Sequence, residues 1–265
     1  MNSIISVEHL VKHYGDFVAV NDISFNLGKG EFFGFVGPNG AGKTTTINIL
    51  ATLLEPTSGT VSVASFDVTK DKDDVRSSIG IIFQDPSLDL ELTAWENLEL
   101  HARLYGVPKD VFRKRADELL TLVELLDRKN SIVNTFSGGM KRRLEIVRGL
   151  LHHPKLLILD EPTIGLDPQT RAYIWRYLKQ IRETEEITVF LTTHYLPETE
   201  QCDHIAIIDK GSIIAYGTPE ELKNKFNQQS MDAVFIEATG HGIRDEELSP
   251  EAQARVRHKS GMSWR

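Results

Sequence analysis

The sequence contains few of the residues that stabilise secreted or metal-clustered proteins. Only one of its 265 residues is a cysteine, Cys202. The chain therefore cannot form an internal disulfide or a cysteine metal cluster, and a reducing cytoplasm is the expected compartment. We expect the lone thiol of Cys202 to be inert.

Long apolar runs and an excess of basic charge are also missing. No run approaches the roughly 18 to 20 residues that span a bilayer, and Met1 to Gly15 lacks the apolar segment of a secretory signal. We expect a soluble chain whose role at a membrane, if any, depends on another polypeptide. The 30 Lys and Arg against 38 Asp and Glu give a net charge of −8. This balance argues against general electrostatic binding to nucleic acid.

Strand-like and helical patterns alternate along much of the chain, whose length suits one large domain or one domain with a small appendage. This alternation predicts a layered α/β core. Helical patterns cover Thr44 to Leu54, Pro168 to Arg182, and Pro219 to Phe226, which follows Thr218 as an N-cap. The strand-like runs are Ile5 to Val11, Phe32 to Val36, Gly59 to Val63, Ile79 to Phe83, Lys155 to Leu159, Thr188 to Leu191 and Ile205 to Ile208.

The pattern changes between Thr93 and Leu151, where helical spacing continues without a convincing strand. This predicts a helical insertion in the α/β core. After Phe226 come a short apolar piece, Met231 to Thr239, an acidic stretch at 244–247 and a basic one at 255–259. We expect the last 20 or so residues to form a poorly ordered tail.

A glycine-rich segment lies between the apolar run that ends at Val36 and the helical stretch that follows it. It matches the pattern G-x-x-x-x-G-K-[ST], whose backbone N–H groups and helix N-terminus bind nucleotide phosphates. Lys43 is expected to reach the β- and γ-phosphates, and the hydroxyl of Thr44 to ligate Mg²⁺. The segment is Gly37, Pro38, Asn39, Gly40, Ala41, Gly42, Lys43, Thr44 and Thr45.

Two carboxylates follow the buried-strand pattern Lys155 to Leu159. At the carboxyl end of a parallel strand beside the phosphate loop, Asp160 would hold Mg²⁺ through its water shell. Glu161 would face the γ-phosphate and polarise the attacking water. The alternative is that two acidic residues simply end a strand at the surface.

A Ser-Gly-Gly sequence precedes the helical pattern that ends at Leu151. Ser137 is a good N-cap, and the N–H groups near it would bind an anion. Basic residues in the first turn, Lys141 to Arg143, oppose the helix dipole and suggest an anionic partner nearby. The alternative is an ordinary helix cap.

Together these elements resemble the ATP-binding cassette (ABC) ATPases. The phosphate loop, Gln84 after a strand, S-G-G-M, L-L-I-L-D-E, I-G-L-D and His194 after another strand occur in that family's order, over about Ile5 to Phe226. The resemblance implies a P-loop NTPase fold, with a RecA-like parallel sheet core, an antiparallel β subdomain and a helical subdomain at about 86–151. Residues 1–226 would form the ATPase domain, and 227–265 a short extension and flexible tail.

The resemblance also implies a role for each matching residue. Tyr14 would stack on adenine, Gln84 would sense Mg²⁺ and the water, and His194 would contact the γ-phosphate. Asp167 would bridge a dimer interface. Ser137, Gly138 and Gly139 would serve the ATP of a second ABC subunit, so that the working site needs a dimer, expected to be a homodimer formed on ATP binding.

A narrower resemblance, to the ATP-binding subunits of ABC-2 or drug-resistance-type exporters, is carried by Phe83 to Asp89 and Ala233 to Gly240. It implies an ATPase on the cytoplasmic face of the membrane that energises export through a separate permease docked on the helical subdomain. Trp95, Leu98 and Phe112 are candidate docking contacts, with core packing as the alternative.

One departure from the family pattern is F-S-G-G-M in place of L-S-G-G-Q. Met140 cannot make the amide hydrogen bonds of glutamine, although the serine and both glycines remain. A second function to weigh is a soluble ABC ATPase that remodels a cytosolic assembly, for example in cofactor biogenesis. DNA-repair or translation ATPases are disfavoured, because the chain has no long coiled coil, zinc cluster or second cassette.

Overall fold

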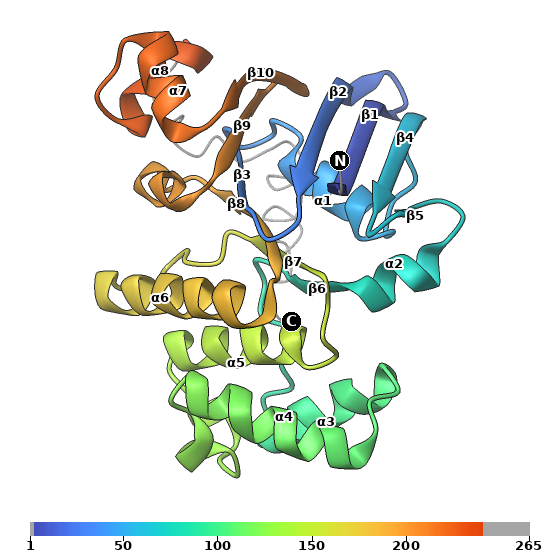
Figure 1. Ribbon diagram of the computed structural model, residues 1–265, viewed down its shortest axis with the longest axis vertical. Helices are drawn as coiled ribbons and strands as arrows, with labels where there is room; N and C mark the ends of the chain where they lie inside the picture. The colour runs from blue at the N-terminus through green and yellow to red at the C-terminus, as the bar shows by residue number, and fades with distance from the viewer. Residues whose placement is uncertain (1–2, 241–265) are drawn as a thin grey trace, which may run out of the picture.

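Two β-sheets organise residues 3–240, the part of the chain that the computed structural model describes (Figure 1). The antiparallel sheet has the order β2-β1-β4-β5 and contains β1 (Ser3–Tyr14), β2 (Phe17–Gly28), β4 (Ser58–Val63) and β5 (Phe66–Asp67). The central sheet has the order β10-β9-β3-β8-β7-β6. It contains β3 (Phe32–Val36), β6 (Ile79–Ile82), β7 (Leu156–Asp160), β8 (Thr188–Thr193), β9 (His204–Asp209) and β10 (Ser212–Gly217).

The central sheet is parallel from β9 to β6, and only β10 runs antiparallel. Helices cover it: α1 (Lys43–Leu50), α2 (Lys72–Ser78), α3 (Ala94–Leu104), α4 (Lys109–Leu122), α5 (Gly138–Leu150), α6 (Pro168–Glu185), α7 (Pro219–Phe226) and α8 (Met231–Thr239). The predicted α/β core, antiparallel subdomain and helical insertion are therefore confirmed. The strands β2 and β10 and the helix α2 were not expected from the sequence.

The two faces of the central sheet bury different layers. Successive side chains of a strand point to opposite faces, and β3 shows the consequence. Phe33 and Phe35 pack with the antiparallel sheet and α1, whereas Phe32 and Val36 pack with α5, α6 and the helical insertion. Because both faces are covered, every residue of β3, β7 and β8 is buried, as the near-continuous apolar runs indicated.

The helical insertion is formed by α3, α4 and the start of α5, which lie together at one end of the molecule (Figure 1). A capping box between Thr93 and Glu96 begins α3. Leu98 and Phe112 are buried between α3 and α4, and the ring of Trp95 packs 4.8 Å from that of Phe112. Leu98 and Phe112 are therefore core residues, and the expectation that they contact a membrane subunit was wrong.

The C-terminal apolar piece forms α8, with Ser230 as its N-cap. Met231, Val234 and Phe235 are buried in the same core as α6 and α7. The domain boundary after Phe226 stays a prediction. The acidic and basic stretches at 244–247 and 255–259, and the tail expected there, lie outside the described residues.

Two expectations about the chain as a whole can be compared with the structure. None of the helices within residues 3–240 has the length and apolar character needed to cross a membrane. Cys202 is buried, and burial raises the pKa of its thiol, so the side chain stays protonated. This explains why the thiol should be inert.

Helix α5 lies against the central sheet where two glycines meet. A Cβ at Gly80 of β6 would lie 2.2 Å from the backbone oxygen of Gly149, which leaves no room for a side chain. A Cβ at Gly149 would instead meet the end of the Ile82 side chain at 2.8 Å. The contact between these glycines therefore sets how closely α5 packs on β6.

We predict that Gly80→Ala destabilises the fold by roughly 1 to 3 kcal/mol, because α5 must move away from β6. Gly149→Ala should cost less, since the Ile82 side chain can change rotamer. Thermal unfolding followed by circular dichroism measures both. Equal melting temperatures for the two variants would show that the backbone contact does not position α5.

Candidate functional site

The carboxyl ends of four neighbouring strands meet at one edge of the central sheet. In the parallel pairs, Val36 lies opposite Thr193, Asp160 opposite Thr192, and Ile82 opposite Leu159. The segments that follow β3, β8, β7 and β6 therefore leave the sheet side by side. These segments are the phosphate loop, His194, Glu161 and the Gln84 segment, so the strand order gathers residues that are far apart in sequence.

The phosphate loop turns directly from β3 into α1. Gly42, the N-cap of α1, has φ 110°, and Gly40 has φ 79°, conformations that suit glycine. A Cβ at Gly37 would lie 2.3 Å from the backbone oxygen of Ile208. No side chain caps α1 and its first turn has no acidic residue, so its N–H groups remain free for an anion.

Lys43 is buried within the loop. Its ammonium donates hydrogen bonds to the backbone oxygens of Gly37 at 2.7 Å and Pro38 at 3.2 Å. Burial lowers the pKa of Lys43, and the nearby carboxylates of Glu161 and Asp160 act in the opposite direction. Thr44, the next residue, is exposed. The ammonium of Lys43 thus lies near the carboxylates of Asp160 and Glu161.

The two carboxylates differ in their contacts. Asp160 ends β7 and accepts a hydrogen bond from the hydroxyl of Thr192 at 2.5 Å. Glu161 lies just beyond the strand with φ 49°, an uncommon conformation for a residue other than glycine. Its N–H donates to the hydroxyl of Thr192 at 3.1 Å. Thr192 therefore fixes both members of the pair, and the alternative of a surface strand end does not hold because both side chains are buried.

His194 contacts Glu161 directly. Its Nδ1 lies 2.7 Å from Oε2 of Glu161, and its backbone N–H donates to the same oxygen at 3.2 Å. Half of the His194 side chain is exposed, so the ring stays accessible while it contacts Glu161. Gln84 follows β6 and is also exposed. Both side chains are accessible at the edge where the phosphate loop lies.

The Ser-Gly-Gly segment belongs to the helical insertion. Ser137 caps α5 by accepting a hydrogen bond from the N–H of Met140 at 3.2 Å. A Cβ at Gly138 would meet no atom within 4 Å, so the backbone there is open. None of the hydrogen bonds or ion pairs within residues 3–240 joins Ser137, Gly138 or Gly139 to the phosphate loop. The side chain of Met140 packs against the hydrophobic core, which explains how an apolar residue fits there.

Two further predicted residues lie at exposed positions. Asp167 caps α6 and accepts hydrogen bonds from the N–H of Thr170 at 2.9 Å and from its hydroxyl at 2.6 Å. Tyr14 ends β1, opposite Phe17, and about half of its surface is exposed. Phe17 is also exposed, an aromatic neighbour that the sequence reading missed. Neither Asp167 nor Tyr14 contacts the phosphate loop through a hydrogen bond.

Two of the basic residues near the start of α5, Arg142 and Arg143, have partners within the protein. Arg142 is buried and donates to the backbone oxygens of Asp160 and Glu161, at 3.0 and 3.2 Å. Arg143 donates to the backbone oxygen of Val123 at 2.7 Å. These acceptors offset the unfavourable helix dipole, so neither arginine needs the anionic partner that their position suggested.

Glu198 is a buried carboxylate that the sequence did not indicate. It accepts hydrogen bonds from the hydroxyl of Thr163 at 2.5 Å and from that of Thr193 at 3.1 Å. It thereby joins the segment after Glu161 to the strand end before His194. The signal in the sequence is faint, because threonines at the end of an apolar strand are also common in ordinary sheets.

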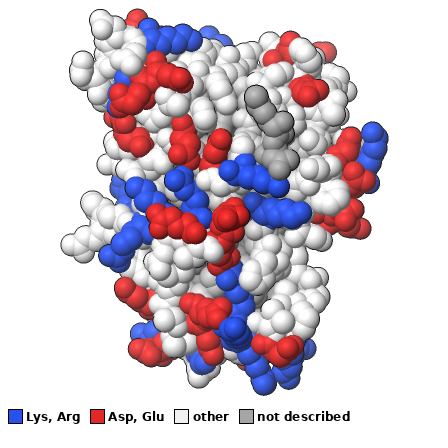
Figure 2. All heavy atoms as spheres, in the orientation of Figure 1, with Lys and Arg blue, Asp and Glu red and all other residues white. Residues whose placement is uncertain are grey.

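Basic and acidic side chains are interspersed on the face shown in Figure 2, with no broad area of basic residues alone. This distribution agrees with the net charge of −8. It offers no extended cationic surface of the kind that follows a nucleic-acid backbone on this face.

Comparison with known proteins adds family information to this geometry. Residues 20–164 match the family model described as ABC transporter. The linearmycin resistance ATP-binding protein LnrL of Bacillus subtilis (strain 168) is 42% identical over 243 residues, which covers 91% of this chain and 76% of that protein. The Nod factor export ATP-binding protein I of Ralstonia nicotianae is 40% identical, over 83% of this chain and 68% of that protein.

Solved structures show the same fold. An ATP-binding subunit of an ABC transporter superposes with a TM-score of 0.81 at 31% identity, covering 89% of this chain and 99% of that one. A dimeric ATP-binding cassette in a post-hydrolysis state, bound to ADP and Pi, gives a TM-score of 0.72 at 30% identity, covering 81% of this chain and 98% of that one.

Proposed function

The chain belongs to the ABC transporter family, and we propose that it is the ATP-hydrolysing subunit that drives export through a separate membrane subunit. The observation that carries this proposal is the sheet edge where the phosphate loop, Glu161 and His194 lie side by side. Such an edge combines a binding site for phosphates with a carboxylate and an imidazole placed beside them.

The phosphate loop is the proposed triphosphate site. The N–H groups in the first turn of α1 have no side-chain cap, and Lys43 supplies positive charge from within the loop. When ATP binds, its phosphate oxygens would replace the backbone oxygens of Gly37 and Pro38 as acceptors for the Lys43 ammonium. Tyr14 is the proposed adenine contact, since an exposed aromatic ring at a strand end is free to stack on a base.

Mg²⁺ is the proposed metal ion. Thr44 supplies an accessible hydroxyl, Asp160 a carboxylate and Gln84 an amide oxygen, all oxygen donors of the kind that Mg²⁺ prefers. The carboxylate of Asp160, near Lys43 and not engaged by an ion pair, fits such a role. Bound Mg²⁺ neutralises charge on the phosphates.

Glu161 is the proposed group that polarises the attacking water. His194 and Thr192 hold its carboxylate and its backbone, so the side chain is oriented before substrate arrives. His194, whose side chain is half exposed, is proposed to contact the γ-phosphate. Both residues then act at the same end of the triphosphate.

A second copy of the chain is proposed to complete the site. Ser137, Gly138 and Gly139 lie in the helical insertion, the backbone at Gly138 is open, and none of the three bonds to its own phosphate loop. They suit the ATP of a facing subunit. Asp167 lies near them, because it caps α6 by bonding to Thr170, whose side chain lies against Gly139. ATP between two subunits would hold the dimer, and hydrolysis would release it.

The membrane subunit is proposed to dock on the exposed face of α3, which would hold this chain at the cytoplasmic face of the membrane. Leu100 and Leu104 are one helical turn apart and are 52% and 76% exposed, with Tyr105 beside them. We therefore propose Leu100, Leu104 and Tyr105 as the docking contacts. They take the place of Trp95, Leu98 and Phe112, which pack in or against the hydrophobic core. An exposed apolar row of this kind favours a partner surface.

The named relatives favour export over the alternative of remodelling a cytosolic assembly. Their printed names describe resistance to linearmycin and export of Nod factor. The transported compound is expected to be recognised by the membrane subunit rather than by this chain.

We predict that Glu161→Gln retains ATP binding and lowers turnover by roughly 10²- to 10⁴-fold, because the amide cannot accept a proton from water. Steady-state phosphate release with the purified protein measures this, and Glu183→Gln on the exposed surface of α6 is the matched control. Turnover close to that of the wild type in Glu161→Gln would refute the role of Glu161.

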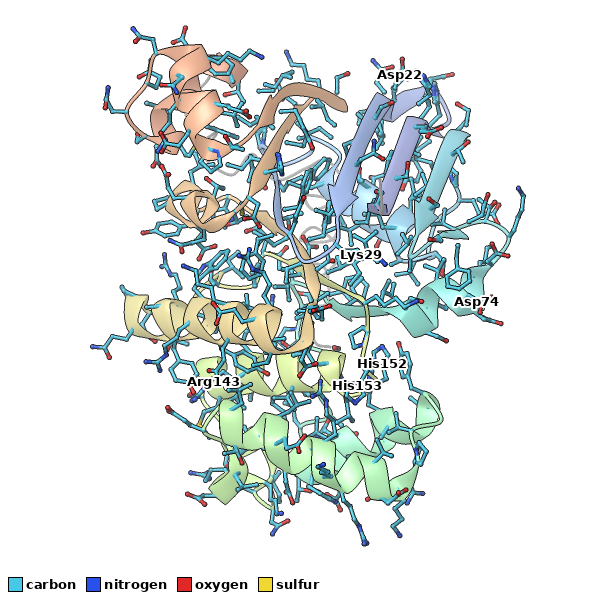
Figure 3. The ribbon with its side chains drawn as sticks, viewed as in Figure 1. Asp22, Lys29, Asp74, Arg143, His152 and His153 are labelled. Carbon is cyan, nitrogen blue, oxygen red and sulfur yellow. The ribbon has the colours of Figure 1, made fainter. Side chains whose placement is uncertain are left out.

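Lys43→Ala should abolish measurable ATP binding, since it removes the only cation aimed into the loop from α1. Lys29→Ala is a matched control, because Lys29 lies before β3, at the opposite end of the strand from the phosphate loop (Figure 3). Titration calorimetry compares the two affinities. Equal affinities in both variants would contradict the assignment.

Replacing both Leu100 and Leu104 with Glu should release the protein from the membrane fraction, because two charges would then face the partner. The ATPase activity of the isolated chain should stay unchanged. Ile236→Glu, at an exposed position of α8, is the control. Continued sedimentation of the double variant with the membrane subunit would place the docking surface elsewhere.

A further inference from the structure

Arg142 is a buried cation at the candidate site that the proposed mechanism leaves without a role. Its guanidinium has five N–H donor positions, and each finds an acceptor. Nε donates to the backbone oxygen of Pro162 at 2.8 Å, Nη1 to that of Phe83 at 2.8 Å and to Oε2 of Glu145 at 3.1 Å. Nη2 donates to the backbone oxygens of Asp160 and Glu161, at 3.0 and 3.2 Å.

Four of the five acceptors belong to the two segments that carry the reacting side chains. Three of them are the consecutive backbone oxygens at 160–162, so Arg142 bonds to the carbonyl of Glu161 and to the carbonyls of the residues before and after it. The fourth, at Phe83, immediately precedes Gln84. One side chain therefore links the segment after β7 to the segment after β6.

Glu145 balances the charge of Arg142 and extends the link. Only 2% of Glu145 is exposed, and a buried arginine needs such a partner because burial lowers its pKa. The other carboxylate oxygen of Glu145 accepts from the N–H of Ser87 at 2.8 Å. Arg148, one turn further along α5, donates to the backbone oxygen of Ser87 at 2.7 Å. The segment from Phe83 to Ser87 is thus held at both ends by α5.

Helix α5 begins at the proposed contact with a second subunit's nucleotide. Ser137 caps it, and Arg142 lies little more than one turn further on. A shift of α5 along or about its axis would therefore move the Ser-Gly-Gly segment and the guanidinium together.

We propose that Arg142 is a positioning residue for ATP hydrolysis, one that holds the backbone of Glu161 and Gln84 in place and couples it to α5. The proposal rests on the proposed function of Glu161. It requires the planar fork of arginine, because a lysine has three donors on a single atom and cannot satisfy the five acceptors that lie around the guanidinium.

The test compares Arg142→Lys with Arg143→Lys in the full chain. Both variants keep the charge and lie in the same turn of α5, but Arg143 faces the helical insertion, where it donates to Val123 and lies over the ring of Tyr173 (Figure 3). Arg142→Lys should lower kcat by roughly 10- to 100-fold, as a misplaced reacting group does, with KM for ATP nearly unchanged. Arg143→Lys should leave both constants within about twofold of the wild type.

A double-variant cycle with Glu161→Gln separates positioning from general stabilisation. If Arg142 acts through Glu161, Arg142→Lys should lower turnover much less in the Glu161→Gln background than in the wild type. An equal loss in both backgrounds, or a kcat for Arg142→Lys equal to that of Arg143→Lys, would overturn the proposal. Normal turnover in Glu161→Gln alone would instead overturn the proposed function.

Glu145→Gln provides a second variant in case Arg142→Lys does not fold, as judged by circular dichroism. The glutamine keeps an acceptor but loses the charge that orients Arg142, so kcat should fall in the same direction by a smaller factor, again with little change in KM. A folded Glu145→Gln variant whose kcat equals that of the wild type would count against the proposal.

Discussion

The parallel alignment of β3, β8, β7 and β6 is the constraint on which the rest of the structure depends. Parallel strands end at the same edge, and their register places Val36, Thr193, Asp160 and Ile82 close to that edge. Each strand then contributes one short segment to the site. The antiparallel sheet and α1 cover one face of these strands and the helices cover the other, so the edge is the part of the central sheet that can receive a charged ligand.

Buried polar groups hold the segments at this edge in place. Thr192 bonds to both Asp160 and Glu161, whereas Glu198 and Arg142 each bond to two segments, and all three are buried. A buried polar group without partners is costly, so every member of such a network restricts the positions of the others. The proposed catalytic carboxylate is therefore oriented by the fold itself. Because α5 supplies Arg142, the helical insertion and the sheet edge are linked through side chains as well as through the backbone.

Local signals predicted much of this arrangement. Caps at Ser137, Asp167 and Thr218 begin helices where the sequence indicated, since a side chain that bonds to its own turn needs no distant partner. The strands β3 and β7 were visible as continuous apolar runs because both of their faces are buried. Strand β2 alternates buried and exposed residues and has polar residues at Asn21 and Asp22, so its pattern was weaker.

The sequence by itself determined the chemistry of the protein: a phosphate loop, an acidic pair and the order of motifs that marks its family. These features depend on residue type and short spacing, which are local. Only the tertiary structure decided that Arg142 bonds inward to backbone oxygens, that Leu98 and Phe112 are core residues, and that Leu100 and Leu104 remain exposed. The physical reason is that strand order and helix packing bring together residues such as Phe83, Arg142 and Glu161, and no spacing along the chain specifies which of them will meet.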